Sequence, residues 1–337
     1  MTNSAAQRAA EVRLSAGLFA LRGRGLLRVE GTDRVRWLDG MLSNEIANLV
    51  DGSERSGCYA LLLSPKARIL ADLHVLRRGE ALWLELSGAA LESVRAHLER
   101  YVVADDVTLS DVTAEWARFA LEGPRARAIL EAATGGSLAL AAESCTDLRL
   151  AGTQILVAAY GWSGGAGYQL FVPVAQAEDA VAALRKAGGA QLVEADEETL
   201  EVLRIEAGIP RLGAELDEDV LPAEAGLVAR AVSLTKGCFT GQEIVARLES
   251  RGQVNHLLVG LGCDDASPPT PETPLVDQDG KRVGEVTSAC VSASAGAIAL
   301  AYVRRPFAVA GCELRAGSQR VRVAELPFVP LVAEAGR

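Results

Sequence analysis

Residues 236–243 read Lys-Gly-Cys-Phe-Thr-Gly-Gln-Glu and are followed by an apolar pattern with helical spacing. Glycines on both sides of a cysteine predict a tight, exposed loop, and the pattern after Gly241 predicts a helix that begins there. A helix N-terminus and the ammonium group of Lys236 would both favour the thiolate of Cys238, which makes the loop a candidate nucleophile, redox or ligand site. A cysteine packed as a small apolar residue under the helix start fits the same spacing.

A second stretch, residues 203–210, reads Leu-Arg-Ile-Glu-Ala-Gly-Ile-Pro and closes a helix predicted over residues 197–207. Glycine and proline after the last apolar position are typical of a helix C-terminus. Arg204 and Glu206 are two positions apart and therefore point to different sides of this helix. Either a local ion pair or a ligand contact by one of them is compatible with that spacing.

Three polar residues follow the cysteine in the helix predicted after Gly241. Gln242 and Glu243 lie in its first turn, where the helix dipole favours a carboxylate whatever its function. Arg247 follows Glu243 by one turn and has the spacing of an i,i+4 ion pair. Stabilisation of the helix therefore explains these residues as well as ligand binding does.

The composition limits the class of protein. A chain of 337 residues with 49% hydrophobic residues corresponds to two or three folded domains. Because 44 Asp and Glu outnumber 34 Lys and Arg, the formal net charge is -10, and we expect no direct nucleic-acid binding. The sequence contains no recognisable secretory signal and no apolar run of about 18 residues, which predicts a cytoplasmic protein without membrane association. Widely spaced cysteines without a Cys-x-x-Cys pair disfavour a metal site.

The periodicity predicts mixed α and β structure up to about residue 250 and antiparallel strands after it. Residues 58–63 and 68–76 alternate as a hairpin with one buried face and one wet face, the latter carrying Asp72 and His74. The glycine-rich residues 161–167 lie between two predicted strands. That position favours a hairpin turn over a phosphate-binding loop.

The two quoted stretches, together with residues 221–227, Ala246-Arg247 and Arg251-Gly252, resemble the YgfZ-type folate-binding proteins, which are relatives of the glycine cleavage T-protein. Further segments fit the same family, namely residues 31–44, 63–68, 121–124, 161–164 and 283–288. Ala67 stands where that family usually has glycine. The resemblance extends over residues 14–328.

The resemblance implies an α+β fold arranged as a three-domain cloverleaf around a central opening that holds a reduced folate. Two mixed α/β domains with antiparallel sheets would precede a C-terminal antiparallel β-barrel. The first domain, which carries the cysteine loop, would combine residues 14–53 with 113–250. Residues 54–112 would form the second domain and residues 251–330 the barrel.

The resemblance also implies roles for individual residues. Cys238 would be the reactive residue, assisted by Lys236. The residues expected to contact tetrahydrofolate, or a one-carbon derivative of it, are Arg204, Glu206, Tyr168, Gln242, Glu243 and Arg247. The expected partners are iron-sulfur enzymes, with an indirect link to tRNA modification.

The sequence departs from the T-protein branch at two places. The loop at residues 161–169 lacks both acids that help that branch to hold the folate ring, and residues 86–92 lack an aspartate matching its catalytic one. The leading hypothesis is therefore a folate-binding protein that assists maturation or repair of iron-sulfur enzymes through Cys238. A folate-dependent aminomethyltransferase or demethylase that uses a carboxylate elsewhere is the alternative, and an interaction scaffold without folate binding is the third.

Overall fold

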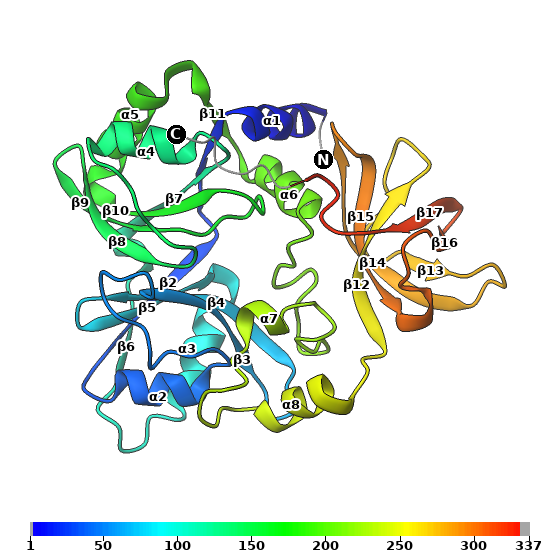
Figure 1. Cartoon of the computed structure of the whole chain (residues 1–337), viewed down its shortest axis with the longest axis horizontal. Coiled ribbons are helices and arrows are strands. Elements are labelled where there is room, and N and C mark those ends of the chain that lie inside the picture. Colours follow the sequence, from blue (N-terminus) through cyan, green and yellow to red (C-terminus); the bar gives the residue numbers. More distant parts are fainter. Residues whose placement is uncertain (1–2, 331–337) are drawn as a thin grey trace.

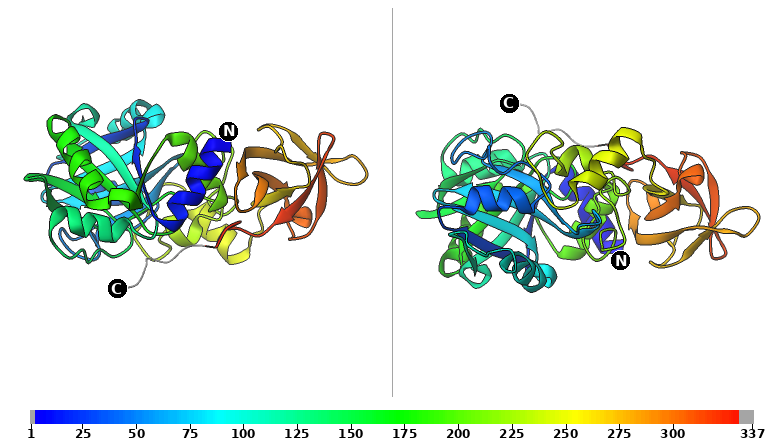
Figure 2. Two further views of the ribbon diagram at one scale, coloured as in Figure 1. Left: turned by 90° about the horizontal axis from the view of Figure 1, so that it is seen from above. Right: turned by 90° about the horizontal axis from the view of Figure 1, so that it is seen from below.

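The computed structural model describes residues 3–330, which form three lobes around a central region (Figure 1). Two lobes each contain an open sheet, and the third is a closed barrel. Views from above and below place the barrel at one end of an elongated molecule (Figure 2). This arrangement confirms the predicted fold class of two mixed α/β domains with antiparallel sheets and a C-terminal β-barrel.

The first lobe is built on a six-stranded sheet with the strand order β11-β1-β7-β10-β9-β8. The pair β1–β11 is parallel and the other pairs are antiparallel. Apolar side chains of α4 and α5, such as Ile129 and Leu184, cover one face of the sheet. The lobe comprises α1 (Asn3–Leu14), β1 (Ala16–Ala20), β7 (Trp116–Glu122), α4 (Ala126–Thr134), β8 (Cys145–Leu150), β9 (Thr153–Ala158), β10 (Gly167–Pro173), α5 (Ala177–Gly188), β11 (Leu192–Ala195) and α6 (Glu197–Glu206).

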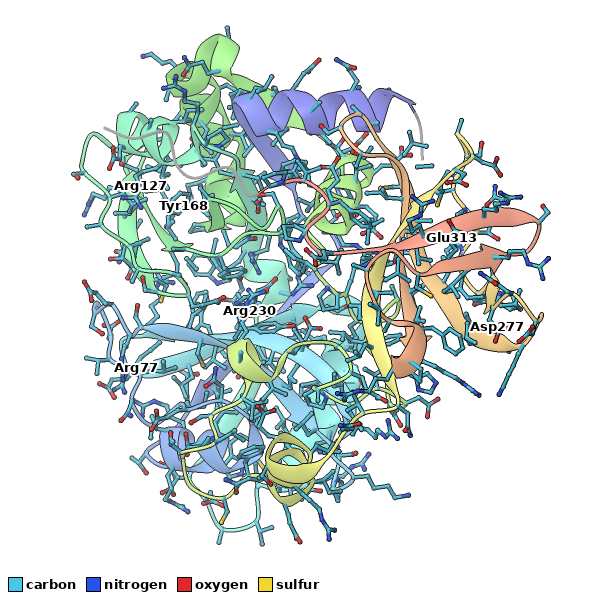
Figure 3. All side chains as sticks on the ribbon, turned by 45° about the vertical axis from the view of Figure 1, so that its right-hand side comes forward. Arg77, Arg127, Tyr168, Arg230, Asp277 and Glu313 are labelled. Atoms are coloured by element: carbon cyan, nitrogen blue, oxygen red, sulfur yellow. The ribbon has the colours of Figure 1, made fainter. Side chains whose placement is uncertain are left out.

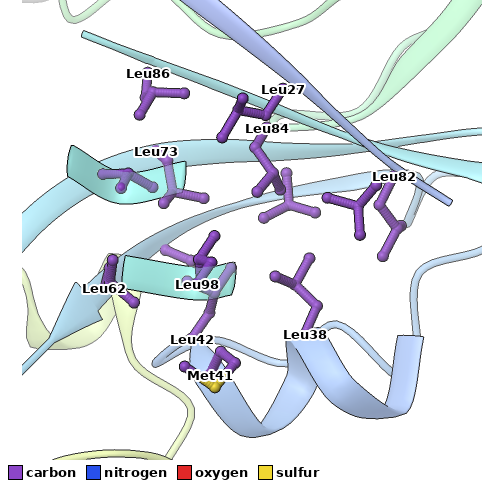
Figure 4. Packing of buried hydrophobic residues seen from close by; sticks show 14 of the residues in the cluster. Leu27, Leu38, Met41, Leu42, Leu62, Leu73, Leu82, Leu84, Leu86 and Leu98 are labelled. Atoms are coloured by element: carbon purple, nitrogen blue, oxygen red, sulfur yellow. The ribbon is translucent and has the colours of Figure 1, made fainter. Parts of the chain in front are cut away.

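The second lobe is an antiparallel five-stranded sheet with the order β3-β4-β5-β2-β6. Leu38 and Leu98, from its two helices, pack against strand residues such as Leu73 and Leu84 in one leucine-rich core (Figure 4). The lobe comprises β2 (Arg24–Glu30), α2 (Arg34–Met41), β3 (Gly57–Leu63), β4 (Ile69–Arg78), β5 (Ala81–Ser87), α3 (Leu91–Glu99) and β6 (Thr108–Asp111).

The sheets divide the N-terminal residues differently from the predicted ranges. Residues 24–41, which were expected beside residues 113–250, supply β2 and α2 of the second lobe. The physical reason is that β2 pairs with both β5 and β6, while the buried face of α2 closes the core beneath them. The segment after α6 also packs on the second lobe, because Leu216 and Phe239 share a buried cluster with Leu61.

The predicted wet face of the 58–76 hairpin is buried. Asp72 and His74 are each only 4% exposed, so the expectation of a solvent-facing side was wrong. The reason is that the opposite face of the sheet meets the first lobe, where Leu76 and Trp83 pack against Phe171. The alternation of apolar and polar residues indicated that the hairpin has two different faces. It could not show that other parts of the protein pack on both of them.

The third lobe is a closed barrel with the strand order β12-β15-β14-β13-β16-β17. Helices α1 and α6 lie between the first sheet and this barrel, because Val12 and Leu203 share a buried cluster with Ile298 and Leu300. The connection from α6 contains α7 (Val228–Ala231) and α8 (Gln242–Arg251), and the barrel comprises β12 (His256–Cys263), β13 (Pro274–Val276), β14 (Arg282–Ser292), β15 (Gly296–Arg304), β16 (Glu313–Ala316) and β17 (Gln319–Ala324).

Candidate functional site

A pocket of about 420 Å³, called the central pocket below, lies between the two open sheets and α6. Apolar walls and convergent polar groups together are typical of small-molecule sites. Its lining residues are Leu21, Gly23, Arg24, Asp72, Ser87, Trp162, Glu197, Leu200, Glu201, Arg204, Arg211 and Leu212.

Three neighbouring strands of the second lobe bring polar side chains to one side of the central pocket. Arg24 on β2 pairs directly with Ser87 on β5. The β4–β5 ladder pairs Leu73 with Leu86, so the next position along places Asp72 beside Ser87. The row Arg24, Ser87 and Asp72 therefore lies on one face of the sheet, where β2 begins and β5 ends.

The arginine of this row is fixed by a buried glutamate. Arg24 donates two hydrogen bonds to Glu85, from Nε at 2.5 Å and from Nη2 at 2.9 Å, and the Tyr160 hydroxyl donates a third at 3.2 Å. Burial raises the pKa of Glu85, but the positive charges of Arg24 and Arg118 outweigh burial and hold it at about 2. Glu85 is therefore a permanent anion that orients Arg24 and is unsuited to proton transfer near neutral pH.

Asp72 has a different environment. Its Oδ2 accepts a hydrogen bond of 3.0 Å from the Tyr59 hydroxyl, and within residues 3–330 the carboxylate forms no ion pair. Burial raises the pKa of Tyr59 well above its usual value, so Tyr59 stays a hydrogen-bond donor. A carboxylate that lines a pocket and has no cation bound to it suits general acid–base chemistry.

The sequence did not single out Asp72 as a functional residue. A T-protein-like aspartate was expected near residues 86–92, and none was found there. The structure instead supplies a carboxylate from the adjacent strand, at the level of Ser87. The available signal was a charged residue inside a run of apolar strand residues, which is unusual for a buried strand.

Arg204 lines the opposite side of the central pocket, but its guanidinium is occupied by protein groups. It donates to Glu201, to Glu215 at 2.7 Å and to Ser288 of the barrel at 2.5 Å. Its side chain is 2% exposed. Arg204 thus connects α6, the following loop and the barrel. The resemblance implied a folate contact for this residue, whereas its hydrogen bonds in the structure are to protein groups.

Glu206 lies outside the central pocket, on another side of α6. Its carboxylate accepts from Arg13 Nε at 2.6 Å and from Ser292 Oγ at 2.5 Å, and it is 2% exposed. These bonds tie α1, α6 and the barrel together. The predicted folate contact by Glu206 conflicts with this burial, whereas the prediction that Arg204 and Glu206 face different sides is correct.

The glycine loop, defined as residues 161–167, separates the central pocket from a second one of about 540 Å³, called the side pocket. Trp162 lines the central pocket, and most of the loop lines the side pocket together with Arg127, Tyr168 and Arg230. Figure 3 labels these last three residues. Arg127 donates to the Tyr168 hydroxyl at 3.1 Å. Tyr168, predicted to contact folate, therefore borders the side pocket.

The ammonium group of Lys236 binds the end of α2. It donates to the carbonyl oxygens of Leu42 at 2.9 Å, Asn44 at 2.8 Å and Asp39, and it lies 3.3 Å from the Asp39 carboxylate. The side chain is 1% exposed, and burial lowers the pKa of the amine despite the nearby Asp39. Lys236 is therefore a buried anchor of the cysteine loop, and its three protons are taken by carbonyl groups, so the predicted assistance to Cys238 does not fit this geometry.

The remaining predicted residues gather around α8, apart from the central pocket. Cys238 is exposed, Gln242 is half-buried, and Glu243 and Arg247 are exposed. None of these four residues lines the central pocket. The helix does begin at Gln242, and Gly241 caps it in a left-handed conformation with φ of +83°, which confirms the predicted start. The reactivity of Cys238 stays a prediction.

Gly241→Ala should destabilise the protein by roughly 2–4 kcal/mol. Gly241 has positive φ, and an added Cβ would lie 2.9 Å from the Ser64 carbonyl oxygen and 3.0 Å from the Ala67 Cα. Both contacts would be with backbone atoms, which cannot move aside as easily as the end of a flexible side chain. Gly237→Ala in the same loop is the matched control, since a Cβ added there would meet no atom of residues 3–330 within 4 Å. Urea unfolding should show a change within about 0.5 kcal/mol for the control, and equal effects of both changes would contradict this packing.

Within residues 3–330, no helix combines the length and the apolar character that a membrane span requires. The central pocket, with an acid and an arginine contributed by one sheet and a tryptophan by the other lobe, is the candidate small-molecule site of a three-lobed fold with a C-terminal barrel.

Comparison with known proteins identifies the family. The family described as GCVT N-terminal domain matches residues 1–236, and the glycine cleavage T-protein C-terminal barrel domain matches residues 257–330. The chain therefore belongs to the glycine cleavage T-protein family.

Individual relatives agree with this assignment. The chain is 34% identical to an aminomethyltransferase of Moorella thermoacetica, in an alignment that covers 94% of this chain and 87% of the relative. It is also 34% identical to an aminomethyltransferase of Rubrobacter xylanophilus, with 94% and 84% covered. The crystal structure of the glycine cleavage system aminomethyltransferase T from Bartonella henselae superposes with a TM-score of 0.86 at 26% identity, covering 96% of this chain and 89% of that one.

These relatives overturn the leading functional hypothesis. The sequence motifs favoured a protein that assists iron-sulfur enzymes, whereas the relatives that match nearly the whole chain are named aminomethyltransferases. The structural likeness to an aminomethyltransferase of the glycine cleavage system points the same way. The prediction gave too much weight to the absence of acids at residues 86–92 and 161–169, because the carboxylate elsewhere that its alternative required had not been located.

Proposed function

We propose that this protein is a tetrahydrofolate-dependent aminomethyltransferase that works in the central pocket. The observation that carries the proposal is Asp72, a buried carboxylate without an ion-pair partner among the described residues, at the meeting point of the lobes. Family membership and the similarity to named aminomethyltransferases support it. Tetrahydrofolate as the acceptor is likewise part of this proposal.

The residues of the central pocket fit a heterocycle that has apolar faces and polar edges. Leu21, Leu200 and Leu212 supply apolar walls. The buried Nε1 of Trp162 has no hydrogen-bond partner among residues 3–330, and a ligand with an acceptor atom would satisfy it. Trp162 and these leucines would hold the reduced pterin, and tetrahydrofolate supplies the nitrogen nucleophiles that take up the one-carbon unit.

In such a transfer the protein would act as a general acid and base. When the methylene carbon of an aminomethyl thioether passes to tetrahydrofolate, the departing sulfur and the departing amine each gain a proton, and two nitrogens of the folate each lose one. Asp72 is placed to exchange these protons, and the Tyr59 hydroxyl holds its carboxylate in one orientation. Glu85, ionised and bound to Arg24, keeps a fixed charge beside it.

The proposal is tested by turnover of the purified protein with tetrahydrofolate and an aminomethyl thioether. The thioether carries the transferable group on a good leaving atom, and complete transfer yields one thiol, one ammonia and methylenetetrahydrofolate. We expect ammonia release that depends on tetrahydrofolate and saturates with its concentration. Tetrahydrofolate binding without any ammonia release would contradict the enzymatic role.

A further inference from the structure

Glu122, at the end of β7, is enclosed by the glycine loop. It is 0% exposed, and its carboxylate oxygens accept hydrogen bonds from Trp162 N at 3.0 Å, Ser163 N at 3.2 Å and Ser163 Oγ at 2.7 Å. A methyl group added at Gly161 or Gly167 would lie only 2.6 or 2.8 Å from its Oε2. The loop therefore wraps this carboxyl group and leaves no space beside it.

Glu122 has no counter-ion among residues 3–330. Within the described part of the chain it forms no ion pair, and its strand neighbours across the sheet are Gly17 on β1 and Gly167 on β10. Charged and titratable side chains of the adjoining elements have other partners. Arg118 contacts Glu85 and the Phe171 ring, the Tyr160 hydroxyl binds Glu85, Arg127 of α4 binds Tyr168, and Arg13 of α1 binds Glu206.

This burial makes the ionisation of Glu122 costly. Burial raises the pKa of Glu122 to about 7, even though the hydrogen bonds from Ser163 and Trp162 lower it. The carboxyl thus changes charge in the physiological range while it is enclosed. If the loop opened and water reached it, its pKa would return toward the ordinary value of about 4.3.

The loop that Glu122 holds forms the wall between the two pockets. On the central side, the Arg24 guanidinium lies over the Trp162 ring, 4.8 Å from its centroid. On the other side, Gly161 and residues 164–167 border the side pocket. A shift of this loop would therefore move Trp162 and change the shape of both pockets.

We propose that Glu122 is a positioning residue: its protonated carboxyl holds the glycine loop closed with Trp162 in the wall of the central pocket, and loss of the proton releases the loop. A neutral carboxyl can still accept from Trp162 N at one oxygen, and its own proton can be donated to Ser163 Oγ at the other. An ionised carboxyl without a cation gains solvation when the loop opens.

The direction of the pH dependence follows from linkage. The closed form binds the proton more tightly than the open form, so closure is fully favoured below the open-state pKa and loses that advantage as pH rises through about 7. Between pH 5.5 and pH 8, the ratio of closed to open loop should fall roughly 30-fold. This consequence does not depend on catalysis.

The test follows the exposure of Trp162 in the ligand-free protein. Quenching of Trp162 fluorescence by acrylamide is obtained as the difference between each protein and its Trp162→Phe counterpart, from pH 5 to pH 8. We expect quenching to rise with pH in the native sequence and to stay low at every pH in Glu122→Gln, which mimics the neutral carboxyl. Glu178→Gln, an exposed glutamate of α5, is the control and should keep the native profile.

A second variant keeps the test decisive if Glu122→Gln folds poorly. Gly161→Ala places a methyl group against the Glu122 carboxyl and should give high quenching at all pH values. A flat native profile, or a native-like pH dependence in Glu122→Gln or Gly161→Ala, would overturn the proposal.

A second experiment, which rests on the proposed function, measures the affinity for tetrahydrofolate by calorimetry at pH 6 and pH 8. We expect weaker binding at pH 8 in the native sequence and equal binding in Glu122→Gln. If tetrahydrofolate binds at neither pH, the proposed function fails while the fluorescence result on Glu122 stands by itself. Equal binding by the native protein at both pH values would contradict control of the central pocket by Glu122.

Discussion

Asp72→Asn is expected to lower kcat for aminomethyl transfer by about 10²- to 10⁴-fold, the usual contribution of a general acid or base. Asparagine has the same shape and can still accept the hydrogen bond from Tyr59, so the pocket should keep its form. It cannot exchange a proton near neutral pH. Tetrahydrofolate affinity, measured separately by calorimetry, should change far less than kcat, because the walls and Trp162 are intact.

The controls for this result separate chemistry from folding. Asp265→Asn removes an exposed carboxylate from the barrel lobe and should leave kcat unchanged. Melting of Asp72→Asn should occur at or above the native temperature, since the change removes a buried charge. Tyr59→Phe, which loses only the orienting hydroxyl, should give a smaller decrease in kcat. Full activity of Asp72→Asn would show that Asp72 is not the acid or base of the transfer.

The alternation of residues in the sequence predicted the strands around Asp72 but could not assign its environment. The hairpin of β3 and β4, the helix α6 and the antiparallel strands after residue 250 follow from local periodicity and turn residues, whereas the two-sheet arrangement and the barrel were implied by the family resemblance. Whether the second face of β4 meets water depends on what packs there. In this protein the covering surface comes from residues such as Phe171, about a hundred positions later in the chain.

The row of Arg24, Ser87 and Asp72 shows the same limit. Its members come from three strands, and their alignment depends on the register of β2, β4 and β5. A search for an aspartate near residues 86–92 cannot find Asp72, because this residue reaches the same part of the sheet from the neighbouring strand β4. The pocket can keep an acid while the local motif that usually carries it is absent.

The motif around Cys238 illustrates the opposite case, in which a distinctive sequence has a structural explanation for several of its residues. Lys236 binds the carbonyl groups at the end of α2, and Gly241 fits closely against the Ser64–Ala67 turn. Both residues fasten the connection between α6 and the barrel to the second lobe. Sequence alone could not separate this fastening from reactivity, because a buried lysine and a solvated one look identical in a motif.

The second large effect concerns the buried charges that join α6 to the barrel. Arg204→Met should destabilise the protein by about 3–5 kcal/mol, because it leaves Glu215 buried without its cation. Glu215 is 0% exposed, and besides Arg204 it accepts hydrogen bonds from Ser288 and Thr287 of β14. Urea unfolding measures the loss, and Arg211→Met is the matched control. Arg211 is 46% exposed, and its guanidinium lies as far as 3.5 Å from the Glu201 carboxylate. Removing such an exposed ion pair should cost less than about 1 kcal/mol.

A double change identifies the source of this destabilisation. In Arg204→Met with Glu215→Gln, no buried charge is left without a partner, so much of the lost stability should return. If instead the double variant loses as much stability as the sum of two independent changes, packing of the arginine side chain, and not its charge, holds α6 to the barrel. That outcome would also return Arg204 to consideration as a ligand-binding residue, because it lines the central pocket opposite Asp72.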